Sequence, residues 1–157
     1  MIRSIVGGVI AGAAGEMLLN VISYADMFVR AHSASQMPGK AAGKLADLAG
    51  VELAKPGERP EKLEARKESA GAFMGYGVAM GIGVLYAVLR RLGLRLPLPL
   101  AGLAIGGTAM AFSDSIATAV GATDPRSWGV SGWMLDVITH AAYGVATAAT
   151  LDLIDPL

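Results

Sequence analysis

Charged residues divide the chain into four long apolar stretches. They run from Ser4 to Val29, Ala70 to Leu89, Pro97 to Val120 and Gly129 to Leu151. A helix needs about 20 predominantly apolar residues to cross the hydrocarbon core of a bilayer, and each stretch is long enough. The second contains no charged residue, whereas the other three contain acids. The pattern predicts four transmembrane helices.

The longest connection, residues 30–69, holds most of the charge. Within it, Pro38 to Gly50 has the spacing of an amphipathic helix. Its apolar side carries Ala41, Ala42, Leu45, Leu48 and Ala49, and its polar side carries Lys40, Lys44 and Asp47. Such a helix either lies on the membrane surface or packs on the bundle. Pro60 and Glu61 then indicate the start of a charged helical extension into the second span.

The expected fold class is all-α, a four-transmembrane-helix bundle formed by one integral membrane domain over residues 1–157, with an extra amphipathic helix in the first loop. A finer interpretation is two duplicated helix hairpins. Residues 76–79 in the second span read Tyr-Gly-Val-Ala, and residues 143–146 in the fourth repeat them. Repeated hairpins build small transporters and bundles, although a chain so rich in glycine, alanine and valine also offers such a match by chance.

Composition supports a membrane protein. Hydrophobic residues make up 54% of the 157 residues and charged residues only 17%, whereas soluble domains carry about 25% charged residues. The 13 basic and 13 acidic residues cancel, so no global basic field attracts nucleic acid. The chain has no cysteine, which excludes disulfides and thiolate sites. The expected partner is the lipid bilayer.

Small residues recur at four-residue spacing in the spans. Lipid provides no hydrophobic drive between helices, so helices associate through close backbone approach at small residues and through hydrogen bonds. We expect packing at Gly8, Gly12, Gly71, Gly75, Gly77, Gly81, Gly102, Gly106, Gly132 and Gly144. The same faces predict a homo-oligomer or a subunit of a larger membrane complex.

Polar residues share these small-residue faces, and the helical rise of about 1.5 Å per residue gives their depth. We name the N-terminal end of the bundle side X and the opposite end side Y. The predicted polar layer consists of Glu16, Asn20, Tyr76, Asp114, Asp136 and His140. Glu16 and His140 fall near their span centres, and the other four lie roughly 6–8 Å from the midplane toward side Y.

An ionisable group that faces lipid costs about 2.5–3.5 kcal/mol, so the layer should point into the bundle. Asp136 and His140, one helical turn apart, are the expected local pair. The layer is either a hydrogen-bonded pin that fixes helix register or a functional pathway for protons or cations. At least one carboxyl group should be protonated, because burial and neighbouring like charge both disfavour a second anion.

A divalent metal is a third interpretation, since two or three carboxylates and one histidine suit a hard cation. The Glu-x-x-His pair of di-iron bundles is not present. His32 lies beyond the first span whereas His140 is near the midplane, so the two histidines do not suit a haem. No catalytic motif occurs, and an enzyme is not expected. No cofactor is predicted, with the divalent metal as the alternative.

Several short motifs carry a family resemblance. They are Gly12-Ala13-Ala14-Gly15, Tyr24-Ala25-Asp26-Met27, Ser113-Asp114, the run from Asp124 to Trp128, and the run from Tyr143 to Ala149. With these motifs the chain resembles small bacterial four-helix membrane proteins, close to a group common in actinobacteria and more loosely similar to the YagU-like inner-membrane family. The resemblance implies a multi-pass location in the bacterial inner membrane and no particular activity.

Two functions follow as expectations. The first is a structural or accessory membrane protein that oligomerises or joins a larger complex through its glycine-rich faces. The second is a small ion- or proton-coupled transporter or channel that uses the intramembrane acids and histidine. A hydrated path to the acids would favour transport, and a dry, satisfied cluster would favour the structural role.

Overall fold

The computed structural model describes residues 1–156, and every regular element in that range is helical. The elements are α1 (Ile2–Arg30), α2 (Met37–Leu48), α3 (Pro60–Arg91), α4 (Leu98–Ala119), the short 3-10 turn η1 (Pro125–Ser127) and α5 (Val130–Ile154). Four of these helices, α1, α3, α4 and α5, are long and apolar enough to cross a membrane. The predicted spans are confirmed to that extent.

The helix ends differ from the apolar stretches by a few residues, except in α3. That helix begins at Pro60, ten residues before the apolar stretch, so the predicted charged extension is helical. Proline suits the first helical position because its missing N–H has no partner there in any helix. Glu61 in the first turn and Arg90 and Arg91 in the last turn complement the helix dipole.

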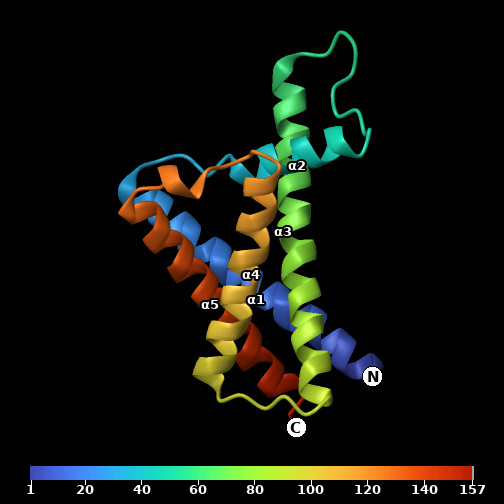
Figure 1. Ribbon diagram of the computed structural model, residues 1–157, viewed down its shortest axis with the longest axis vertical. Coiled ribbons are helices and arrows are strands. Elements are labelled where there is room, and N and C mark those ends of the chain that lie inside the picture. Colours follow the sequence, from blue (N-terminus) through green and yellow to red (C-terminus); the bar gives the residue numbers. More distant parts are fainter. Residues whose placement is uncertain (157) are drawn as a thin grey trace.

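The two ends of the bundle are distinct (Figure 1). The N-terminus, the α3–α4 turn and the C-terminal end lie together at the lower end of the view, which is side X. The α1–α2 connection, α2, the following loop and the α4–α5 connection lie at the other end, side Y. Helix α2 crosses α3, and the first turns of α3 extend beyond it. The sequence-based assignment of the connections to two sides is therefore confirmed.

Arg66 anchors the loop between α2 and α3. Its guanidinium donates to both carboxylate oxygens of Glu58, at 2.9 Å for Oε1, and to the backbone oxygen of Leu53 at 2.8 Å. Hydrogen bonds from Arg66 hold the pKa of the Glu58 carboxyl below its ordinary value. The long connection thus folds back onto the start of α3.

Backbone contacts at glycine hold the spans together. The closely packed pairs are α1 with α3, α4 with α5, and α1 with α5, whereas α3 and α4 touch little. Gly8 of α1 lies so close to α3 that an added Cβ would be 2.6 Å from the Cα of Val84. Gly102 and Gly106 of α4 lie equally close to α5 around Gly144. Only glycine allows this approach, as expected where lipid gives helices no hydrophobic drive to associate.

The core that these contacts create consists largely of alanine, and its largest fully buried apolar side chains are Tyr143 and Leu151 of α5. The Tyr143 hydroxyl donates to the backbone oxygen of Ala79 in α3 at 2.7 Å. The helices are thus held by close contact and by hydrogen bonds to backbone rather than by bulky side chains.

Three glycines predicted to pack make no close helix contact inside the bundle. Within residues 1–156, an added Cβ at Gly77 or Gly81 would meet no heavy atom within 4 Å, and one at Gly132 would meet only the Cβ of Trp128 at 3.6 Å. In α3 the inward face repeats instead at Gly71, Gly75, Ala79 and Gly83. Gly77 and Gly81 are two residues away from that repeat, about 200° around the helix. Gly132 lies in the first turn of α5, at its side Y end.

Replacing Gly12 with alanine should destabilise the bundle. The added Cβ would be 2.7 Å from the Cα of Met80, in backbone that cannot move independently. Overpacking of this kind costs about 1–3 kcal/mol. The matched control is Gly81→Ala, because the same added atom meets open space there. We expect a lower thermal midpoint by circular dichroism in detergent for Gly12→Ala only; equal midpoints for the two variants would contradict the observed packing.

Candidate intramembrane polar site

Asp136 and His140 lie one turn apart on α5. The imidazole Nδ1 lies 3.1 Å from Asp136 Oδ1 and 2.9 Å from the Asp136 backbone oxygen. Their side chains are 17% and 15% exposed, so both face into the bundle over most of their surface. The structure thus forms the pair that the four-residue spacing predicts.

Asp114 of α4 joins this pair from the neighbouring helix. Its carboxyl group interacts with both Asp136 and His140. Oδ1 of Asp114 and Oδ2 of Asp136 are buried without a hydrogen-bond partner in the described chain. Two facing carboxylates repel one another when both are ionised, and one shared proton removes that repulsion. The α4–α5 pair therefore places two facing acids, which a single shared proton would stabilise, beside a histidine.

Glu16 and Asn20 of α1 form the other side of the layer. Asn20 Nδ2 donates to Glu16 Oε1 at 3.4 Å, and Glu16 interacts electrostatically with His140. Glu16 Oε1 lies 3.2 Å from the position of a Cβ on Gly75 of α3. The absence of a side chain at Gly75 gives the Glu16 carboxylate its space, so this glycine serves the site rather than close helix packing.

Tyr76 does not join the layer. Its side chain is 40% exposed and makes no hydrogen bond within residues 1–156. Tyr76 follows Gly75, and one residue turns a helix by about 100°. Because Gly75 faces Glu16, Tyr76 points toward the outer surface of α3, and its predicted place in the layer was wrong.

Tyr143 was not predicted to belong to the site, yet it lies beneath the layer and is only 1% exposed. The Tyr143 backbone oxygen accepts from Thr147 at 2.8 Å, and both side chains lie against Gly15 of α1. The spacing in the sequence could have predicted its position. Asp136, His140, Tyr143 and Thr147 are three and four residues apart, so they share one face of α5, with Tyr143 and Thr147 below the histidine.

The predicted metal interpretation was based on the same acids and histidine. Within residues 1–156, no group of three or more His, Asp and Glu side chains has the geometry of a metal site. The observed arrangement instead joins one histidine and one carboxylate on α5 with a second carboxylate from α4.

A second polar cluster ties three helices together at side X. Ser4 of α1 is 1% exposed and donates to Asp155 Oδ2 at 2.9 Å. The same hydroxyl accepts from Arg91 Nε at 2.7 Å. Arg90 Nη1 lies 2.9 Å from Asp152 Oδ1. These contacts join the ends of α1, α3 and α5. The cluster could not be predicted from local spacing because Ser4 and Asp155 are 151 positions apart.

Comparisons with known proteins add no assignment: no protein family, no curated protein and no solved structure matches the chain. The similarity to bacterial four-helix membrane proteins stays a prediction.

Asp114→Asn should remove a protonated carboxyl group from the bundle interior. In the wild type, the unpartnered oxygens of Asp114 and Asp136 leave a place for one shared proton. Infrared spectroscopy of the protein in lipid should show the C=O stretch of a carboxylic acid, and that band should disappear in the variant. The matched control is Asp47→Asn, at an exposed position of α2. A wild-type spectrum without the band would mean that both acids are ionised.

Proposed function

We propose that this protein is a multi-pass protein of a bacterial inner membrane whose Asp114–Asp136–His140 cluster carries protons during transport. The observation that supports this function most directly is the pair of buried carboxylate oxygens without hydrogen-bond partners in the described chain. They belong to facing acids on two adjacent apolar helices, next to an imidazole. Ionisable groups inside membrane spans commonly mark proton relays or ion pathways.

A purely structural pin explains the cluster less well. A buried polar network stabilises a fold when all its members are satisfied, and a partly satisfied network is costly. Thr139 and Thr147 on the same helix meet that requirement, because each donates to backbone oxygen one turn earlier. Asp114 Oδ1 and Asp136 Oδ2 meet it only while a proton lies between them, so their hydrogen bonding depends on the protonation of the pair. A group that carries protons needs this dependence, whereas a structural pin does not.

His140 provides a link between the acids of α4 and α5 and Glu16 of α1. Its Nδ1 faces Asp136, and its Nε2 makes no hydrogen bond within the described range. A neutral imidazole accepts a proton at one ring nitrogen and releases one from the other. Because a backbone oxygen can only accept, Nδ1 carries the ring hydrogen, and Nε2 is the nitrogen that can take up a proton. In the proposed relay, Nε2 accepts a proton from the Glu16 carboxylic acid, which interacts with that histidine, and Nδ1 releases its proton to the Asp114–Asp136 pair when that pair is ionised.

The double variant Asp114→Asn with Asp136→Asn should abolish proton flux. Asparagine keeps the size of aspartate and, like the protonated acid, has one acceptor oxygen and a donor group, but it cannot exchange the proton. Flux would be measured with a pH-sensitive dye inside proteoliposomes under an imposed potential. Asp47→Asn serves as the charge-matched control because Asp47 is exposed on α2. Circular dichroism and gel filtration would check folding; a folded double variant with wild-type flux would refute the proposal, and loss of folded protein would favour the pin.

A structural or accessory role is the second candidate, favoured by the outer face of α3. Gly77 and Gly81 have open space around them, and only 22% of the apolar stretch of α3 is buried. Small residues on such a face permit close approach of another helix. In this role the protein would form a homo-oligomer or join a larger membrane complex. Gly81→Leu would then lower the oligomer mass measured by native mass spectrometry without unfolding the protein.

We also propose that α1–α3 and α4–α5 are two copies of one helix pair. In each pair, two glycines on the first helix receive one glycine from the second: Gly83 contacts Gly8 and Gly12, and Gly144 contacts Gly102 and Gly106. This correspondence aligns Gly83 with Gly144, whereas the Tyr-Gly-Val-Ala repeat in the sequence aligns Gly77 with Gly144. It equates Asn20 with Asp114, since each follows the first glycine of its pair by twelve residues. One copy would thus have kept a neutral amide where the other has an acid.

For α2 we propose a position at the membrane surface of side Y. Its residues Gly39, Ala41, Ala42 and Gly43 are buried, and Lys40, Lys44 and Asp47 are exposed. The buried side packs mainly on α3. A helix with small residues against the bundle and charges outward is suited to the interface.

A further inference from the structure

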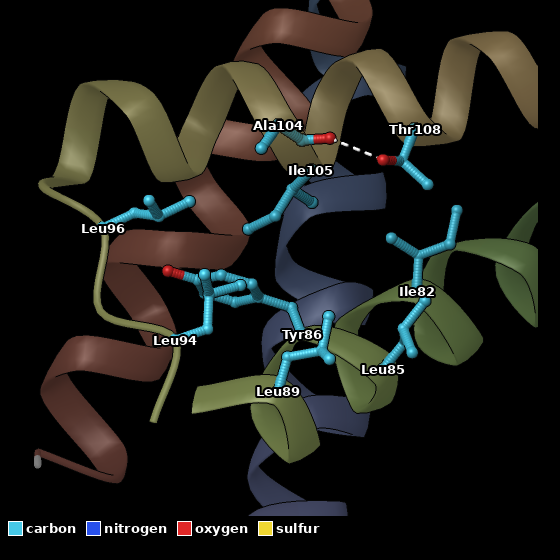
Figure 2. Close-up of a pocket in the computed structure, with 9 residues that line it drawn as sticks. All are labelled: Ile82, Leu85, Tyr86, Leu89, Leu94, Leu96, Ala104, Ile105 and Thr108. Atoms are coloured by element: carbon cyan, nitrogen blue, oxygen red, sulfur yellow. Dashed lines mark hydrogen bonds between the residues drawn. The ribbon is translucent and has the colours of Figure 1, made fainter. Parts of the chain in front are cut away.

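A groove runs between α3 and α4, the two neighbouring spans that touch little (Figure 2). Its volume is about 80 Å³. The walls include Leu85 and Leu89 of α3, Leu94 and Leu96 of the connecting turn, and Ala104 and Ile105 of α4. The Thr108 hydroxyl at its inner end already donates to the backbone oxygen of Ala104 at 2.7 Å. The lining therefore offers an apolar surface to whatever fills it.

The depth of the groove matches one leaflet of a bilayer. It begins at the α3–α4 turn on side X and reaches Thr108, ten residues after the start of α4 at Leu98. At about 1.5 Å per residue this is roughly 15 Å, half of the approximately 30 Å hydrocarbon core. A groove at this depth that opens toward the bilayer meets the acyl chains of lipids.

One arginine of side X lies at the mouth of the groove. Side X carries the four arginines Arg3, Arg90, Arg91 and Arg95, and the acids there are Asp152 and Asp155. Asp152 pairs with Arg90, and Asp155 contacts Arg3, Arg91 and Ser4. Arg95, between the lining residues Leu94 and Leu96, has no ion pair or hydrogen bond to any of residues 1–156. Its charge is left for a ligand.

Tyr86 adds a hydrogen-bond donor at the same place. Its ring lines the groove, and in Figure 2 its hydroxyl points toward Leu94 and Leu96 of the turn. This hydroxyl makes no hydrogen bond within the described part of the chain, although Tyr86 is only 6% exposed. A donor and a cation thus stand at the mouth of an apolar groove.

We propose that this groove binds an anionic phospholipid, with one acyl chain between α3 and α4 and the headgroup phosphate on Arg95. Basic pockets between transmembrane helices are typical sites for anionic headgroups. The Tyr86 hydroxyl donates to a phosphate or glycerol ester oxygen at the polar end of the chain. This site is independent of the proposed proton relay, because it uses neither its residues nor its half of the bundle.

A second copy of the chain suits the groove less well. The side X acids of another copy would be engaged already by Arg90, Arg91 and Ser4, so they would leave Arg95 without an anion. The charge of the site therefore favours a lipid phosphate.

Native mass spectrometry with added phosphatidylglycerol or phosphatidylcholine tests the site. The wild type should retain one phosphatidylglycerol and bind it more tightly than phosphatidylcholine. Arg95→Gln should weaken phosphatidylglycerol binding about tenfold, the effect of losing one charge-assisted hydrogen bond. Ala104→Phe should fill the groove and abolish retention. The matched controls should bind as the wild type does; they are Arg126→Gln on side Y and Ala111→Phe, at an exposed position nearly two turns further along α4 and outside the lining of the groove.

Other outcomes would overturn the proposal. Equal binding of the two lipids would show that the bound lipid is not selected by its headgroup, and retention by Ala104→Phe would show that it lies elsewhere. If inorganic phosphate competed as strongly as the lipid does, the acyl chain would have no role in binding. Because the chain has no native cysteine, Leu85→Cys can be tested for disulfide cross-linking in membranes; efficient dimer formation would assign the groove to a second copy. Arg95 lies on an exposed turn, so its variant remains informative even if Ala104→Phe does not fold.

Discussion

Contact between helix backbones at glycine is the constraint on which the structure depends. Lipid neither pushes apolar helices together nor satisfies their polar groups, so the spans adhere only where their surfaces approach very closely. Gly8 and Gly12 allow this between α1 and α3, and Gly102 and Gly106 allow it between α4 and α5. Tyr143 adds a hydrogen bond to Ala79 from within the closely packed region.

The same contacts set the register that assembles the polar layer. Gly106 of α4 faces the backbone of His140 in α5, and the two helices run in opposite directions. Side chains on a helix lean toward its N-terminus. In an antiparallel pair, Asp114 and Asp136 therefore lean toward each other from levels about one turn apart. The facing acids follow from glycine packing two turns away, with no direct link in sequence.

Features that depend on one helix were predictable, and features that depend on two were not. The four spans follow from length and hydropathy, and the Asp136–His140 pair follows from four-residue spacing. The packing face of α3 could not be predicted in this way, because its sequence has glycine at Gly71 and Gly75 and again at Gly77 and Gly81. Only contact with α1 and α2 selects the first set. The pairing of Ser4 with Asp155 likewise exists only in the folded chain.

The contacts that hold the helices to one another are unevenly distributed over the bundle. Ser4, Arg91 and Asp155 fix α1, α3 and α5 to one another at side X, but none of these residues belongs to α4. That helix packs mainly on α5 and touches α3 little, so the groove lies at the α3–α4 interface. Gly102 and Gly106 hold α4 tightly on α5, so Asp114 and Asp136 stay together if the α3–α4 interface opens. Under the proposed transport function, the proton must therefore reach and leave the two acids by exchange with neighbouring groups rather than by separation of α4 from α5.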